Sequence, residues 1–151
     1  MEYIEHSKVD GCIFCMAQEN EDSVENLIAF RGERAYVILN RYPYTSGHLM
    51  VVPFDHKPKL EELDPSTRAE MMELTSRCMT VLRRIYHPDA FNMGANIGES
   101  AGAGVKSHVH IHIVPRWGGD TNFMTVVGEV RVLPEALERT YERVKTAFLE
   151  G

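Results

Sequence analysis

The sequence predicts an α+β fold, in which an antiparallel sheet packs against one long helix and a second helix ends the chain. Short apolar segments separated by turn-forming residues are typical of strands joined by tight turns. A single long segment with helical spacing lies between them, which favours antiparallel pairing over a series of βαβ units. The expected strands are residues 27–30, 35–39, 48–52, 91–97, 108–114 and 126–133.

The long helix is expected to begin at Pro65 and to end near Tyr86. Proline fits the first helical position, and the side chain of Asp64 is expected to accept hydrogen bonds from the free amides of the first turn. Apolar residues recur three and four positions apart, so one stripe, which includes Cys78, faces a core. A second amphipathic helix is expected over residues 134–149.

Length and composition favour a single folded domain over residues 1–151. With 44% hydrophobic and 25% charged residues, the chain has the balance of a globular protein. We expect residues 1–26 to form a loop-rich N-terminal segment, because they show no sustained hydrophobic period. Sixteen Lys and Arg stand against 22 Asp and Glu, a net charge of -6 that argues against nucleic acid as a partner. No segment approaches the ~20 apolar residues that cross a bilayer, so we expect a cytoplasmic protein without membrane contact.

Three histidines alternate with apolar residues late in the chain: His108, His110 and His112. In a strand, alternate side chains share one face, so the three imidazoles lie together and the apolar residues between them can pack on the long helix. A solvated polar face would explain one such histidine, but three in strict alternation favour a chemical site. Two chemistries suit the row: metal binding by converging imidazoles, or phosphoryl transfer by one neutral imidazole acting as nucleophile.

A glycine-rich loop over residues 98–104 lies just before the histidines. Glycine lets backbone amides approach an anion closely, and such loops bind phosphate groups. An imidazole with the ordinary pKa of about 6.5 is mostly neutral at physiological pH and can attack phosphorus. The loop and the histidine row together therefore favour phosphate chemistry.

The segment 108–114 resembles the signature of the histidine triad family of nucleotide hydrolases and transferases. The similarity extends upstream to Asn40 and to the pair Gly47 and His48. Downstream, residues 115–123 resemble the fragile-histidine-triad branch and its prokaryotic diadenosine tetraphosphate phosphorylase and hydrolase relatives. The resemblance implies a histidine-triad fold and a homodimer that acts on nucleotides.

The same resemblance implies a mechanism. His110 attacks the α-phosphate of a nucleotide and becomes a nucleotidyl-histidine, which water or inorganic phosphate then cleaves. His112 contacts the phosphate and the leaving group, and His48 orients the histidines through hydrogen bonds. The positions implied to bind substrate are Asn40, Asn96, Gly102, Gly104 and His112.

The loop before the triad departs from the family pattern. Many relatives carry Gln followed by Ser or Thr there, whereas this chain has Gly102-Ala103-Gly104-Val105. The missing amide and hydroxyl put simple hydrolysis in doubt, and the small residues leave room for inorganic phosphate as the acceptor. Hydrolysis and phosphorolysis both stay open.

The leading functional hypothesis is a nucleotidyl hydrolase or transferase that acts on dinucleoside polyphosphates and needs no metal for catalysis. Three alternatives stay open. The first is a nucleoside phosphoramidase, and the second is a nucleotide-binding sensor with little turnover. The third is a metal-binding module in which the triad itself holds zinc.

Cys12 and Cys15 have a spacing that lets both thiolates reach one zinc ion, although zinc needs two further ligands. The alternative is that Cys12 and Cys15 are ordinary reduced thiols beside a loop and bind no metal. The family resemblance implies that His56 and His108 complete a structural zinc site, which would fasten the N-terminal segment to the histidine strand and leave His110 free. The family resemblance also implies that Phe14 and Ile38 line an adenine pocket, and plain apolar packing is the alternative for both.

Overall fold

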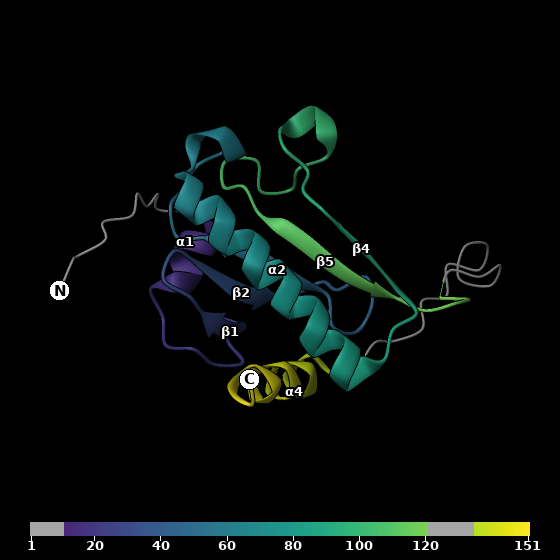
Figure 1. Cartoon of the computed structure of the whole chain (residues 1–151). Coiled ribbons are helices and arrows are strands. Elements are labelled where there is room, and N and C mark those ends of the chain that lie inside the picture. The colour runs from purple at the N-terminus through teal and green to yellow at the C-terminus, as the bar shows by residue number, and fades with distance from the viewer. Residues whose placement is uncertain (1–10, 121–134) are drawn as a thin grey trace.

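The computed structural model describes residues 11–120 and 135–151, and within them a five-stranded antiparallel sheet carries the fold (Figure 1). The strand order is β1-β2-β3-β5-β4. The helix α2 lies across one face of the sheet, and α4 packs against α2 and β1. The elements are α1 (Ile13–Gln18), β1 (Ile28–Arg31), β2 (Ala35–Leu39), β3 (Leu49–Pro53), η1 (Leu60–Glu62), α2 (Pro65–Tyr86), β4 (Ala90–Gly94), η2 (Glu99–Ala101), β5 (Ile111–Arg116) and α4 (Leu137–Leu149). The predicted α+β class is confirmed.

The long helix α2 spans the residues that the apolar spacing predicts. Its sheet-facing stripe is buried and includes Cys78, which is fully inaccessible. Asp64 is the N-cap, but its side chain makes no capping hydrogen bond, so that part of the prediction is wrong. The carboxylate instead lies 3.7 Å from the Arg34 guanidinium, which draws it away from the first turn.

A carboxylate on α2 fixes the turn between β1 and β2. Glu70 Oε2 accepts hydrogen bonds from the backbone amides of Arg34 and Ala35, at 2.6 and 2.7 Å. A charged acceptor makes these bonds stronger than neutral ones. The helix therefore holds the hairpin, and β2 in turn sets the register of β3 from Ala35 opposite Pro53 to Leu39 opposite Leu49.

The strand that carries the histidines begins later than predicted. The expected strand 108–114 is observed as β5, Ile111–Arg116, because β3 pairs only with residues 111–113. Before that point the Val109 amide donates to the Lys57 carbonyl at 2.8 Å, which places this stretch against the loop after β3. The expected strand 91–97 likewise ends at Gly94, opposite His112, where its pairing with β5 ends.

Three further expectations concern the N-terminal segment, the last predicted strand and membrane spans. The sequence pattern does not predict α1, which lies inside the segment expected to be loop-rich. The predicted strand 126–133 lies outside the described residues. None of the described helices is both long and apolar enough to cross a membrane.

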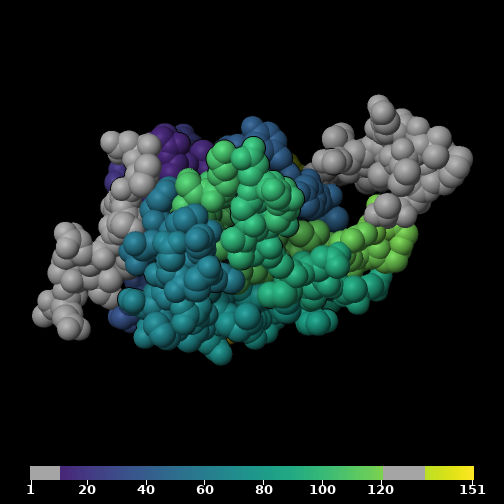
Figure 2. Space-filling model, turned by 90° about the horizontal axis from the view of Figure 1, so that it is seen from above, coloured from purple at the N-terminus to yellow at the C-terminus, as the bar shows by residue number. Residues whose placement is uncertain are grey.

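Figure 2 shows that the green segment with the glycine-rich loop projects at the surface beside the blue-teal segment that leads into α2.

Candidate active site and metal site

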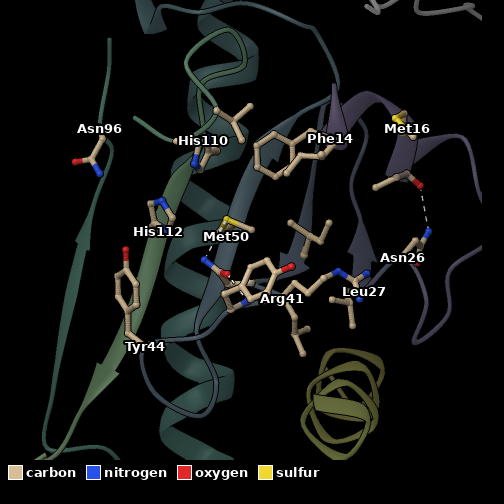
Figure 3. Close-up of a pocket in the computed structure, with 18 of the residues that line it drawn as sticks. Phe14, Met16, Asn26, Leu27, Arg41, Tyr44, Met50, Asn96, His110 and His112 are labelled. Carbon is tan, nitrogen blue, oxygen red and sulfur yellow. Dashed lines mark hydrogen bonds between the residues drawn. The ribbon is translucent and has the colours of Figure 1, made fainter. Parts of the chain in front are cut away.

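A cavity of about 640 Å³ opens beside the histidine strand (Figure 3). Its walls come from α1, β2, β3, the loop after β2 and the glycine-rich loop. All five residues predicted to bind substrate line it, which are Asn40, Asn96, Gly102, Gly104 and His112. His110 lines the cavity as well, whereas His48 lies behind His112 and is 1% exposed. The structure therefore brings the predicted site residues together from four separate stretches of chain.

His110 lies in the cavity wall with one ring nitrogen committed to the backbone. Its Nδ1 is 2.9 Å from the carbonyl oxygen of His108. A carbonyl oxygen only accepts, so Nδ1 carries the proton and donates. In the neutral ring Nε2 then keeps its lone pair. The Phe14 ring, with its centroid 4.8 Å away, covers His110 on one side.

Burial keeps His110 uncharged. The side chain is 6% exposed, and desolvation lowers its pKa, although the hydrogen bond to the His108 carbonyl opposes that shift. A neutral imidazole with a free lone pair is a nucleophile or a general base, whereas a protonated one is neither. The hydrogen bond and the burial of His110 therefore both favour a neutral ring with an unprotonated Nε2.

A hydrogen-bond relay behind the cavity fixes the tautomer of His112. The backbone amide of Tyr44 donates to Nδ1 of His48 at 3.3 Å, so the neutral His48 ring carries its proton on Nε2. That nitrogen lies 2.9 Å from Nδ1 of His112. His48 therefore donates to His112, whose own proton is left on Nε2. Asn40 Nδ2 is also 3.4 Å from His48 Nε2, but this contact is too long to displace the bond to His112.

The relay can present a donor to an anion without carrying a positive charge. Burial lowers the pKa of His48 to about 4, with smaller contributions from His112 and His110. Burial also lowers the pKa of His112 to about 4, helped by His110. His110 thus offers an acceptor and His112 a donor, with ring centroids 4.8 Å apart. This is the pair of groups that nucleophilic attack at a phosphate requires.

Four side chains at the other end of the histidine strand could hold a metal ion. They are Cys12, Cys15, His56 and His108, whose ligand atoms all lie within 4.8 Å of one another. Nδ1 of His108 is 3.4 Å from the Cys12 sulfur and 3.7 Å from the Cys15 sulfur. Nδ1 of His56 is 3.4 Å from the Cys15 sulfur. A tetrahedral zinc ion separates its sulfur and nitrogen ligands by about 3.6 Å, given bonds of about 2.3 and 2.05 Å.

A hydrogen bond from Nε2 of His108 orients Nδ1 of the same ring as a metal ligand. Nε2 donates to the Pro53 carbonyl at 2.8 Å, which leaves Nδ1 unprotonated and turned toward the thiols. Metal-binding histidines are usually oriented by such a hydrogen bond. Burial also lowers the pKa of His108 to about 4, with neighbouring His56 and His110 adding to the shift. The donor set and its geometry fit zinc.

The two sites share the histidine row but divide its members. Among the described residues, the cluster with His108 is the only group of three or more metal-ligating side chains close enough to hold an ion. It includes neither His110 nor His112. This division disfavours the alternative in which the triad itself binds zinc. Phe14 connects the sites, because it lies between the two cysteines and contacts both His108 and His110.

A family model described as HIT domain matches residues 21–119. The chain belongs to the HIT domain family. The match covers the sheet, α2 and the whole histidine row, so it includes the cavity walls except α1 and Asn20.

Named relatives and solved structures of HIT proteins are similar over most of this chain. An AP-4-A phosphorylase from Mycobacterium tuberculosis is 43% identical over 82% of the chain, and the chain spans 64% of that relative's length. An asymmetrical bis(5'-nucleosyl)-tetraphosphatase from Schizosaccharomyces pombe is 30% identical over 85% of the chain and 66% of the relative. A zinc-bound histidine triad family protein from Mycobacterium smegmatis has a TM-score of 0.73 at 28% identity, covering 93% of this chain and 94% of its own.

Residue patterns in the sequence do not single out two features of this HIT site. Tyr44 lines the cavity and orients His48 through its backbone amide, which any residue could supply. Arg41 lines the rim and donates to the Glu25 carbonyl at 2.6 Å, which ties the loop after β2 to the segment after α1. For Tyr44, the available signal was an aromatic residue four positions before His48.

Proposed function

We propose that this HIT protein cleaves dinucleoside polyphosphates, of the diadenosine tetraphosphate kind, by nucleotidyl transfer to His110. One observation carries the proposal: the bond from His110 Nδ1 to the His108 carbonyl leaves Nε2 as a free lone pair in the cavity wall. The names of the relatives, AP-4-A phosphorylase and bis(5'-nucleosyl)-tetraphosphatase, support the substrate class.

The proposed reaction proceeds in two displacements. In the first, the Nε2 lone pair of His110 attacks the α-phosphorus, a P–N bond forms, and the P–O bond to the remaining polyphosphate breaks. The Nε2–H of His112 donates to the departing oxygen, where negative charge develops. In the second, an acceptor oxygen attacks the same phosphorus and the P–N bond breaks, which restores the lone pair on His110.

The acceptor distinguishes a hydrolase from a phosphorylase. Water releases AMP from the intermediate, whereas inorganic phosphate releases ADP. Gly102 has a φ of +88°, and a Cβ atom at Gly102 or Gly104 would have no atom within 4 Å. Gly102, Gly104 and His110 all line the cavity, so this small-residue loop supports an acceptor as large as inorganic phosphate, and we propose phosphorolysis as the main reaction.

The test is an assay of diadenosine tetraphosphate with and without inorganic phosphate, with products separated by chromatography. Phosphorolysis gives ADP and ATP only when phosphate is present, while hydrolysis gives AMP and ATP in either case. The His110→Ala variant should lose at least about 10³-fold in turnover, because the nucleophile is removed. His87→Asn is the matched control, since His87 is exposed and has a left-handed φ of +50° that Asn tolerates. Full turnover by His110→Ala would refute the proposal.

We also propose that Cys12, Cys15, His56 and His108 bind one structural zinc ion. The distances among these ligands and the zinc-bound relative from Mycobacterium smegmatis support this assignment. When bound, zinc supplies a crosslink between α1 and the start of the histidine strand and takes no part in the displacements. Metal analysis of purified protein should find about one zinc per chain, and its absence with unchanged folding would contradict the site.

We infer a cytoplasmic homodimer without nucleic-acid or membrane partners. Cysteine thiols stay reduced in the cytoplasm, where they can serve as metal ligands. The net charge of -6 disfavours binding to nucleic acid. Among the described residues, β4 lies at one edge of the sheet with β5 as its single neighbouring strand, and this edge is a candidate surface for pairing with a second copy. Light scattering with size-exclusion chromatography measures the mass directly, and a monomer at micromolar concentration would contradict the dimer.

A further inference from the structure

Five aromatic rings form a continuous series of contacts along the cavity. The ring centroids of Phe14 and His110 are 4.8 Å apart, and those of His110 and His112 are also 4.8 Å apart. Behind them, His48 lies 5.1 Å from His112 and 4.8 Å from Tyr44. Figure 3 shows Phe14, His110, His112 and Tyr44 in this order along the pocket. Tyr44 therefore lies on the side of His112, away from Phe14.

The two ends of the cavity differ in exposure. At the Phe14 end the lining includes the buried apolar side chains of Phe14, Leu27 and Ile38. At the other end the Tyr44 side chain lines the cavity yet is 64% exposed. Within residues 11–120 and 135–151 its hydroxyl has no hydrogen-bond partner, so the hydroxyl takes no part in the relay that the Tyr44 backbone amide supports.

This arrangement assigns directions to the two halves of a dinucleotide. With the α-phosphorus at Nε2 of His110, the attached nucleoside fits the apolar end beside Phe14. An in-line displacement places the departing oxygen opposite Nε2 of His110, and the Nε2–H of His112, which donates to that oxygen in the proposed reaction, directs the leaving polyphosphate along the His112 side of the cavity. The second nucleoside, at the far end of the polyphosphate, then reaches the open end at Tyr44.

We propose that Tyr44 is a specificity residue, whose exposed ring stacks on the base of the leaving nucleotide. The inference rests on the proposed function and adds the site for the second base. A neutral phenol ring offers a π-face to a base but no charge to a phosphate, and stacking of bases on aromatic side chains is tolerant of base identity. The ring thus selects substrates that carry a second nucleoside over those that end in a bare polyphosphate.

The test compares diadenosine tetraphosphate with adenosine 5'-tetraphosphate, which has the same phosphate chain without the second nucleoside. For Tyr44→Ala, kcat/KM for the dinucleotide should fall by about 5- to 100-fold, mainly through KM. For the mononucleotide, kcat/KM should change less than about twofold, because it makes no stacking contact. Tyr44→Phe keeps the ring and should retain the preference for the dinucleotide. If Tyr44→Ala folds poorly, Tyr44→Leu takes its place and should show the same selective loss.

The outcomes separate this inference from the proposed function. An equal loss with both substrates would overturn the inference, because Tyr44 would then act only through the position of His48. An unchanged preference in Tyr44→Ala and Tyr44→Leu would overturn it as well. If the unmodified protein cleaves neither compound, the proposed function itself fails.

Discussion

The buried relay predicts a specific loss of stability in acid. The pKa of His48 is about 4 in the folded protein, against 6.5 for an ordinary histidine, and burial is the main cause. Between these two values the unfolded chain binds a proton at this residue and the folded protein does not. Stability therefore falls as the pH drops from 6.5 to 4, and His48 adds no further loss below pH 4. The difference corresponds to about 3 kcal/mol.

Urea unfolding at pH 7, 6, 5 and 4, with zinc at a fixed concentration, measures this loss. The free energy of unfolding of the unmodified protein should fall over this range by about 3 kcal/mol more than that of His48→Asn. Metal-ligand protonation affects both proteins and cancels in the comparison. His87→Asn removes an exposed histidine and should follow the unmodified protein. Identical pH profiles for His48→Asn and the unmodified protein would refute the reasoning.

Two further substitutions test the metal site and the loop before His48. Cys15→Ser should abolish stoichiometric zinc binding and destabilise the fold by about 4 kcal/mol when free zinc is 1,000-fold above the original dissociation constant. Cys78→Ala should keep its zinc in the same metal analysis, and a full zinc content in Cys15→Ser would count against the cluster. Gly47→Ala should lower the free energy of unfolding by about 1–3 kcal/mol, because φ is +86° and the new Cβ would lie 3.0 Å from Leu82 Cδ2. Gly94→Ala adds a Cβ in open space and is the control in urea unfolding; equal stability of the two variants would contradict the steric argument.

Strong local patterns predict most of this fold. The helix α2 is long, begins with a proline and repeats its apolar residues over six turns, so its limits follow from the sequence. The hairpin of β1 and β2 is equally local. By contrast α1 has only six residues, too few for a period to show. Its N-cap Cys12 and its residue Cys15 contact His108 and His56, about 95 and 40 positions away, and contacts this distant leave no local pattern in the sequence.

In the candidate site, too, the local sequence predicts which residues take part, whereas distant contacts determine how each ring is protonated. Alternation along the chain predicts that His108, His110 and His112 lie close together, although only His112 lies within β5 and His108 belongs to the metal-ligand cluster. Their different roles come from hydrogen bonds with distant or backbone atoms: the Pro53 carbonyl, the His108 carbonyl and the Tyr44 amide. Backbone groups are the same in every residue, so no residue pattern reveals which nitrogen of each ring carries the proton.

Trapping the covalent intermediate tests the central claim most directly. The protein is mixed with diadenosine tetraphosphate in phosphate-free buffer, quenched in base within milliseconds to seconds, and analysed by intact-mass and peptide mass spectrometry. The account predicts a mass increase of one adenylyl group, located on His110 and absent from His110→Ala. An adenylyl group on another residue, or turnover with no covalent species at any time point, would contradict it.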